Sequence, residues 1–209
     1  MPTVGEEQKK PPILELGDVR LRPLRTSDAP ALLAYLSDPR VIEHTSIPIA
    51  TPESVAAAVA RDMAAYREGS SFRLALASSD DRLIGICGVN TWSSVHRHAE
   101  LAYELAPDYW GRGYMRAAVL ALLRWGFSDL NLNRVHAFVM TTNARSIQLL
   151  KRCGFTREGT LRHPPASHAG CRRTSTSSRF SLKTSPSTKW ARRLTRRCSE
   201  PRDSLRSTS

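Results

Sequence analysis

The alternation of apolar and polar positions predicts a chain in which helices and strands follow one another. Apolar side chains that recur at every second position are typical of strands, and recurrence at every third or fourth position is typical of amphipathic helices. The pattern predicts strands over residues 19–24, 72–77, 83–91, 100–105, 134–140 and 155–160. It predicts helices from residue 27 or 28 to residue 36, and over residues 51–67, 112–127 and 144–152. Helices inserted between strands indicate a layered α/β fold.

Two of these helices carry clear start signals. Thr51 can cap the helix over residues 51–67, and Pro52 stands at its first helical position, where a missing N–H costs nothing. Asn143 can cap the short helix over residues 144–152 in the same way. These two helices should therefore begin where the pattern places them.

A turn rich in glycine joins the strand over residues 100–105 to the next helix. Gly111 and Gly113 flank Arg112, and Arg116 follows within the first helical turn. Glycine permits positive φ and close approach of a ligand, and the first amides of a helix lack partners inside it. Such amides can bind diphosphate oxygens. An ordinary turn is the alternative, and the turn alone favours it because G-x-G is neither a dinucleotide fingerprint nor a P-loop.

The surroundings of this turn point to a known family. Residues 110–115, W-G-R-G-Y-M, are similar to the phosphate loop of the GNAT superfamily of N-acetyltransferases, and residues 19–28 look like its first strand and helix cap. Residues 18–162 as a whole resemble this family, closest to the branch of ribosomal-protein N-terminal acetyltransferases. The other residues that follow the family's order and spacing are Asn143, Ser146, Gly154 and Phe155.

The resemblance implies a fold, a co-substrate and a reaction. The fold would be the GNAT acyl-CoA N-acyltransferase fold, a mixed central sheet flanked by helices. The enzyme would move the acetyl group of acetyl-CoA directly to a primary amine, such as a protein N-terminus. A small amine or an antibiotic is the alternative acceptor, and a domain that binds CoA without turnover is a third possibility. The expected partners are acetyl-CoA and the amine, with no metal and no membrane, and a homodimer is left as an open alternative to a monomer.

The resemblance also assigns the co-substrate site. The amides after Gly113 would hold the diphosphate, and Asn143 would bind the pantetheine arm or merely cap its helix. A backbone amide at Leu105 or Ala106 would polarise the thioester carbonyl as an oxyanion donor does. The residues expected to bind acetyl-CoA are Leu105, Arg112, Gly113, Tyr114, Met115, Arg116 and Asn143.

Three residues are candidates for proton transfer. Glu100 and Glu104 share one face of their strand by its period of two, and either carboxylate can take a proton from the acceptor amine. A solvated strand face is the alternative for both. The resemblance gives Ser146 the role of protonating the thiolate of CoA, and the alternative is a helix-start hydroxyl that bonds to the backbone.

Charge and composition set the last 47 residues apart. Residues 163–209 hold 11 Lys or Arg and 2 Asp or Glu, so they carry +9 of the whole chain's +12. A basic arm suggests nucleic-acid binding. Because the excess lies outside the family-like part and no RNP, zinc-finger or helix-turn-helix signature accompanies it, nucleic acid is not the expected partner.

This segment also lacks periodicity, with 17 Ser or Thr, which predicts disorder. The resemblance requires one more strand after Leu161, and none is evident, so we expect the last strand to be missing. A shift of reading frame between His163 and Ala166 is our hypothesis, since permitted codons in another frame can spell Y-V-F-S-L-L. The expected organisation is a flexible tail over residues 1–17, a GNAT domain over 18–162 and a basic tail over 163–209.

The remaining signals point to a cytoplasmic protein without a metal. No apolar run approaches the roughly 20 residues that span a bilayer. Cys87 and Cys153 lie in apolar contexts that predict buried, reduced thiols. His96, His98 and His136 have no acidic or Cys partner at metal-ligand spacing, so surface or partly buried positions are expected.

Overall fold

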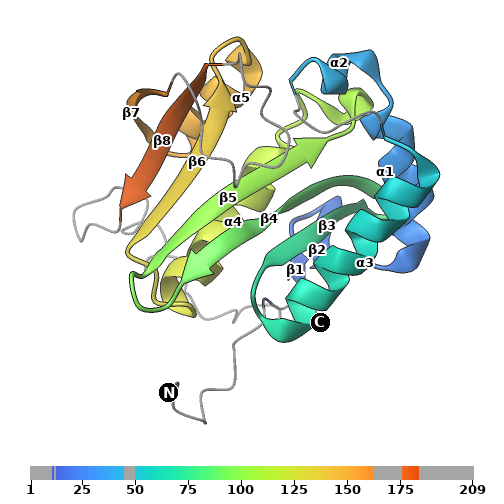
Figure 1. Cartoon of the computed structure of the whole chain (residues 1–209), viewed down its shortest axis with the longest axis horizontal. Helices are drawn as coiled ribbons and strands as arrows, with labels where there is room; N and C mark the ends of the chain where they lie inside the picture. The colour runs from blue at the N-terminus through green and yellow to red at the C-terminus, as the bar shows by residue number, and fades with distance from the viewer. Residues whose placement is uncertain (1–10, 12, 45–49, 162–175, 184–209) are drawn as a thin grey trace, which may run out of the picture.

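One mixed sheet organises the computed structural model, which describes residue 11 and residues 13–44, 50–161 and 176–183. The sheet has eight strands in the order β1-β2-β3-β4-β5-β6-β8-β7, and only β5 and β6 run parallel (Figure 1). The strands are β1 (Leu14–Glu15), β2 (Val19–Pro23), β3 (Phe72–Ser78), β4 (Leu83–Ser93), β5 (His98–Leu105), β6 (Arg134–Met140), β7 (Thr156–Leu161) and β8 (Ser177–Lys183).

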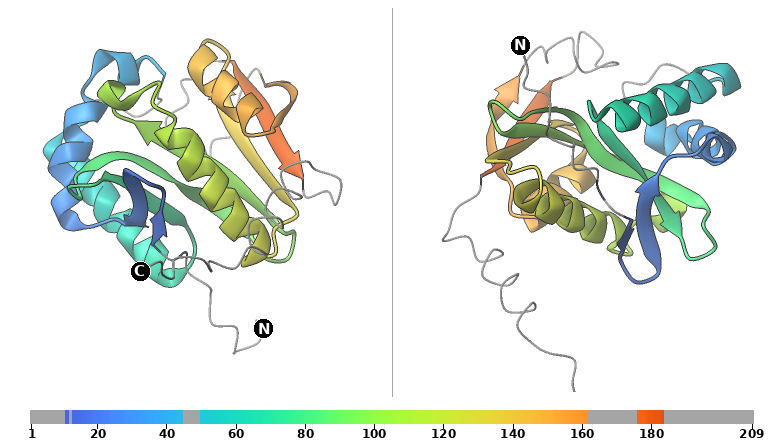
Figure 2. Two further views of the ribbon diagram at one scale, coloured as in Figure 1. Left: turned by 180° about the vertical axis from the view of Figure 1, so that it is seen from behind. Right: turned by 90° about the horizontal axis from the view of Figure 1, so that it is seen from below.

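Helices cover both faces of this sheet. One apolar core joins α4 and α5 to the sheet, and a second joins α1, α2 and α3 to its other face, as Figures 1 and 2 show from opposite sides. The mixed sheet flanked by helices confirms the predicted fold class. The helices are α1 (Ala29–Leu36), α2 (Pro39–Ile42), α3 (Pro52–Glu68), α4 (Tyr114–Ser128) and α5 (Ala144–Arg152), with 3₁₀ turns η1 (Thr26–Asp28) and η2 (Pro107–Tyr109).

The two capped helices begin where the sequence predicts. The Thr51 hydroxyl accepts a hydrogen bond from the Ser54 amide at 3.2 Å, and the Asn143 side-chain oxygen accepts one from the Ser146 amide at 3.0 Å. Each bond satisfies one of the amides that a helix leaves without an internal partner. The start of α5 is therefore fixed by a side-chain cap.

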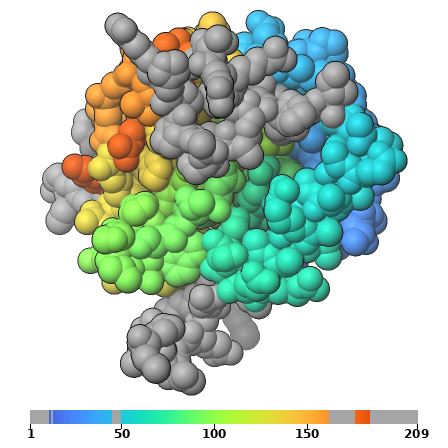
Figure 3. Space-filling view, in the orientation of Figure 1, coloured from blue at the N-terminus to red at the C-terminus, as the bar shows by residue number. Residues whose placement is uncertain are grey.

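Strands β5 and β6 stay together over a short distance only. Their register joins His98 to Arg134, Ala99 to Val135 and Glu100 to His136, and then the two strands separate. Beyond that point β5 remains paired with β4, while β6 continues beside β8. In Figure 3 the blue to teal N-terminal segments lie on the right of the molecule, and the orange to red C-terminal strands lie at the upper left. Among the described residues, the separation leaves one edge of β5 without a strand partner from residue 101 onward.

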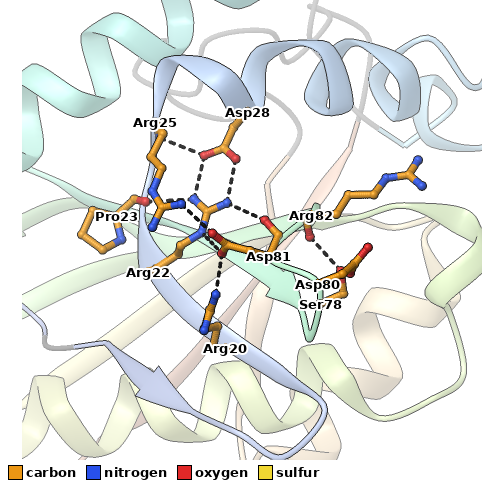
Figure 4. A network of polar contacts seen from close by, with 9 residues as sticks. All are labelled: Arg20, Arg22, Pro23, Arg25, Asp28, Ser78, Asp80, Asp81 and Arg82. Carbon is orange, nitrogen blue, oxygen red and sulfur yellow. Dashed lines mark hydrogen bonds and ion pairs between the residues drawn. The ribbon is translucent and has the colours of Figure 1, made fainter.

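An arginine cluster ties β2 and the residues after it to the turn between β3 and β4. Figure 4 shows the side chains of Arg20, Arg22 and Arg25 converging on Asp81, at 2.9, 2.7 and 2.5 Å. Arg22 is buried and also forms a two-bond pair with the buried carboxylate of Asp28, at 2.8 Å each. The bonds from Arg20 and Arg22 hold the pKa of Asp81 well below its usual value. The cluster therefore fixes where α1 begins.

The prediction of a missing last strand is wrong. Residues 177–183 form β8, which lies between β6 and β7 and pairs with both. Phe180 and Leu182 point into the core, while Ser178 and Ser181 bond to Arg157 and Glu158 of β7. Two apolar positions among serines give too short an alternation to detect in the sequence. The reading-frame hypothesis thereby loses its premise, and the rest of the predicted basic tail lies outside the described residues.

The predicted flexible tail over residues 1–17 also needs correction. Leu14 and Glu15 form β1, which pairs with Leu21 and Arg20 of β2, and Leu16 packs against the core. Residues 1–10 and 12 lie outside the described part. A two-residue strand has no period of its own, so only its packing against β2 defines it.

We predict that Phe180→Ala lowers the free energy of unfolding by about 3–5 kcal/mol, since it empties a fully buried site in a strand paired on both sides. Denaturant unfolding measures the change. Val95→Ala, at a position that is 83% exposed, is the control and should leave stability within about 0.5 kcal/mol. An unchanged midpoint in Phe180→Ala would show that β8 does not belong to the sheet.

Candidate active site

A cavity of about 650 Å³ opens where β5 and β6 separate. It reaches from the start of α4 and α5, on one face of the sheet, to α2 on the other. The residues that line the cavity therefore come from both faces of the sheet, and we call these two parts its two ends. Its lining residues include Arg40, Val41, His44, Tyr103, Glu104, Leu105, Tyr109, Trp110, Gly111, Gly113, Tyr114, Met115, Arg116, Asn143, Arg145, Ser146 and Arg152.

The glycine turn shapes the first end of the cavity. Gly111 and Gly113 have φ values of 79° and 82°, which residues other than glycine rarely adopt. Gly113 is the N-cap of α4 and no side chain caps the helix, so the amides that follow it carry the positive end of the helix dipole. A Cβ at Gly113 would meet no atom within 4 Å. The turn can therefore receive an anionic group against its backbone.

The side chains beside the turn divide in two directions. Met115 is buried in the core under α4, so its bulk leaves the backbone of the turn accessible. Tyr114 and Arg116 line the cavity. Arg112, which the sequence places in the site, is not among the lining residues, and its guanidinium lies 5.4 Å from the ring centre of Tyr109. Its charge can act on the site only from outside.

The end of β5 offers one backbone amide to the cavity. The amide of Ala106 donates to the Ile84 carbonyl at 2.9 Å, on the β4 side, so Ala106 is not the expected thioester contact. By the alternation of a strand, the amide of Leu105 faces the opposite side, where no strand of the described residues pairs with this end of β5. The Trp110 indole donates to the Leu105 carbonyl at 2.8 Å and holds this strand end in place.

The first turn of α5 presents a hydroxyl to the same space. The Asn143 side-chain oxygen caps the helix, which was one of the two roles predicted for it. Ser146 lies in the first turn, and its hydroxyl oxygen is 2.6 Å from the Tyr103 hydroxyl of β5. Both hydroxyls line the cavity. The Ser146 hydroxyl thus contacts the Tyr103 side chain, whereas the alternative prediction had it bonding to the backbone of the helix.

A carboxylate stands at the second end of the cavity. Glu104 accepts a bond from Arg73 at 2.9 Å and one from the Tyr35 hydroxyl at 3.5 Å. Arg73 also lies 3.4 Å from Asp62 of α3, and burial raises the pKa of that carboxyl. The Glu104 carboxylate is therefore held in a fixed orientation by a buried network.

Glu104 lines the cavity and Glu100 does not. The prediction that either carboxylate can take the proton of the amine is therefore corrected to Glu104. The Asn90 amide donates to the Glu100 carboxylate at 3.2 Å, and Glu100 lies opposite His136 where β5 and β6 still pair. Burial lowers the pKa of His136 to about 4, so this imidazole is neutral near pH 7. The strand period puts both glutamates on one face, but only Glu104 lies beyond the point of separation.

Sequence reasoning missed several residues that line the cavity. Trp110 entered the sequence analysis only as the first residue of the phosphate loop, yet it lines the cavity, and the Arg145 guanidinium lies 4.4 Å from its ring centre. Tyr103 follows from the alternation of β5, which places it on the same side as Leu105. Arg40 and His44 of the α2 region carry no recognisable motif.

Other predictions concern groups outside the cavity. Cys87 and Cys153 are buried free thiols, as predicted. Among the residues that the structure describes, no group of His, Cys, Asp or Glu is arranged to hold a metal ion. No helix of that part is long and apolar enough to cross a membrane.

The fold is that of known acyl-group transferases. The structure superimposes on two structures of RimL, a ribosomal L7/L12 alpha-N-protein acetyltransferase, with a TM-score of 0.72 and 16% to 17% identity, covering 82% to 83% of this chain and at least 94% of that one. At this identity the likeness shows that the two proteins share a fold.

The sequence comparisons make the assignment narrower. Residues 18–156 match the family profile described as an acetyltransferase (GNAT) domain. The chain is 35% identical over 145 residues to an uncharacterized N-acetyltransferase, p20, of Bacillus licheniformis, covering 68% of this chain and 81% of that relative. Over 89 residues it is 30% identical to a spermidine N(1)-acetyltransferase of Vibrio cholerae, covering 43% and 51%. The chain belongs to the GNAT family, and is an N-acetyltransferase with acetyl-CoA as its co-substrate.

We predict that Gly113→Val lowers the affinity for acetyl-CoA by about 100-fold or more, because the side chain would stand where the diphosphate must approach the amides. Calorimetric titration measures the affinity. Gly17→Val is the matched control: it has φ of 85°, equally open space around its Cβ and no place in the cavity. Equal affinity in Gly113→Val and Gly17→Val would remove the turn from the site.

Proposed function

We propose that acetyl-CoA enters the cavity from the α4 and α5 side, and that its acetyl group passes directly to a primary amine arriving from the α2 side. One observation carries the proposal: the cavity lies beside the end of β5, beyond the point where β5 and β6 separate, and its lining includes an uncapped helix start and a carboxylate. Direct transfer then needs mainly the correct placement of thioester and amine.

Three groups supply the chemistry in this proposal. The Leu105 amide donates to the thioester carbonyl oxygen as negative charge develops on it. Glu104 takes the proton that the attacking nitrogen loses, directly or through water, because its carboxylate stands at the acceptor end. Ser146 donates its hydroxyl hydrogen to the sulfur of the departing CoA. The amides of residues 114–116 hold the diphosphate.

The charges at the acceptor end favour a single amine, such as a protein N-terminus. Glu104 is the only carboxylate among the described residues that line the cavity, and Arg73 already pairs with it. The α2 end adds Arg40 and His44. Residues 45–49 and 162–175 contain no Asp or Glu in their sequence. A polyamine needs anionic partners for its further ammonium groups, and the described lining of the cavity offers none beyond Glu104.

An acceptor panel tests the proposal. It compares a short peptide with a free N-terminus, the same peptide with a blocked N-terminus, a simple monoamine and spermidine, each with acetyl-CoA. We expect acetylation of the free N-terminus and none of the blocked peptide. Preferential acetylation of spermidine would favour the polyamine acceptor that one relative's name suggests. CoA binding without turnover on any amine would contradict the proposal.

We predict that Ser146→Ala lowers kcat by about 100-fold while the KM for acetyl-CoA stays nearly constant, since the hydroxyl acts on the leaving group and not on binding. Steady-state kinetics with the best acceptor of the panel measures both constants. Ser128→Ala is the control, because it removes a helical hydroxyl that bonds back to the Arg124 carbonyl at 2.9 Å. Equal turnover in Ser146→Ala and the parent would return Ser146 to a structural role.

A further inference from the structure

Two hydroxyl groups from different elements meet inside the cavity. Tyr103 comes from β5, on the side of the strand that faces the gap, and Ser146 comes from the first turn of α5. Their oxygen atoms are 2.6 Å apart, within the range of an O–H···O hydrogen bond. Nothing in the capping of α5 requires this contact, because the Asn143 side chain already caps the helix. The contact between the two hydroxyls therefore serves another purpose than capping the helix.

The surroundings decide which hydroxyl donates. Burial raises the pKa of Tyr103, so its hydroxyl keeps its hydrogen near neutral pH. The acceptors that the described structure places within its reach are the Ser146 hydroxyl at 2.6 Å and the Ser146 carbonyl at 3.4 Å. We assign Tyr103 as the donor to Ser146, because both acceptors within its reach belong to Ser146, and this assignment leaves the hydrogen of Ser146 for another acceptor in the cavity.

The environment strengthens this bond. The buried thiols of Cys87 in β4 and Cys153 beside α5 are the titratable neighbours that act on Tyr103, and burial keeps both neutral by raising their pKa values. A hydroxyl that accepts one hydrogen bond becomes a better donor of the next, and this effect is larger where water is scarce. Ser146 is thus a stronger donor with Tyr103 than without it.

We propose that Tyr103 is a positioning residue that sets the Ser146 hydroxyl as hydrogen-bond donor to the sulfur of CoA. This inference rests on the proposed function, in which Ser146 acts on the leaving group. Tyr103 itself stays protonated throughout, and it acts by stabilising the oxygen of Ser146.

In the transfer step the nitrogen lone pair forms the C–N bond, the C–S bond breaks, and its electron pair leaves on sulfur. Sulfur takes the hydrogen of Ser146, while the bond from Tyr103 stabilises the negative charge that develops on the Ser146 oxygen. Glu104 takes the proton that the acceptor nitrogen gives up, and transfer of this proton through water restores the Ser146 hydroxyl. The products are the acetylated amine and CoA with a free thiol.

The test uses Tyr103→Phe, Ser146→Ala, the double variant and Tyr66→Phe. Tyr66 is the matched control because its hydroxyl bonds to the Pro11 carbonyl at 3.1 Å and does not line the cavity. The first readout is the pKa of the thiol of bound CoA, which is measured from the ultraviolet absorbance of the thiolate in the binary complex. The second is kcat with the best acceptor, and thermal unfolding checks that each variant is folded.

In the parent and in Tyr66→Phe, we expect the thiol of bound CoA to have a lower pKa than in Tyr103→Phe and Ser146→Ala. We expect kcat to fall about tenfold in Tyr103→Phe with the KM for acetyl-CoA unchanged, since a hydrogen bond to a charged group is lost. The double variant should match Ser146→Ala, because Tyr103 acts only through Ser146.

Two results would overturn this inference while leaving the proposed function intact. The first is the same thiol pKa in the parent and in Tyr103→Phe. The second is an equal loss of kcat from Tyr103→Phe with and without the Ser146 hydroxyl, which indicates a structural role. The thiol titration needs no acceptor, so it still decides the role of Tyr103 if no amine is acetylated and the proposed function fails. Failure of the parent to bind CoA would overturn both.

Discussion

The short parallel pairing of β5 and β6 is the constraint on which the site depends. The two strands hold together from His98 to Glu100 and then separate, so the sheet becomes two halves joined at one end. A backbone edge without a strand partner is normally a liability, because its amides and carbonyls remain unsatisfied. In the family to which the chain belongs, acetyl-CoA is the co-substrate. A pantetheine arm that pairs along β5 would satisfy this edge, which links the architecture to the chemistry.

Everything else in the site depends on where that separation begins. Helices α4 and α5 both start beside the gap, so the uncapped amides after Gly113 and the hydroxyl of Ser146 face one cavity. Trp110 donates a hydrogen bond to the Leu105 carbonyl, and Arg73 donates one to the Glu104 carboxylate. These two bonds hold the last two residues of β5 in place. At the other side of the molecule, the bonds from arginines to Asp81 and Asp28 fix the start of α1, whose Tyr35 contacts Glu104.

The sequence predicted those features that depend on local signals. The glycine turn, the Thr51 and Asn143 caps and the bounds of β6 and α5 follow from residue type and period, and they are confirmed. Features that depend on contacts distant in sequence were missed. β8 has only two core-facing apolar residues, and its place between β6 and β7 comes from pairing on both edges. The period of β5 could not separate Glu100 from Glu104, because the difference lies in where the neighbouring strand ends.

A crystal structure of the protein grown with acetyl-CoA tests most directly whether acetyl-CoA lies in the gap between β5 and β6. We predict the diphosphate against the amides of residues 114–116, and the pantetheine arm beside β5. This prediction also places the thioester carbonyl oxygen within hydrogen-bond distance of the Leu105 amide and the sulfur beside the Ser146 hydroxyl. A diphosphate bound away from the glycine turn, or a thioester directed away from the end of β5, would contradict it.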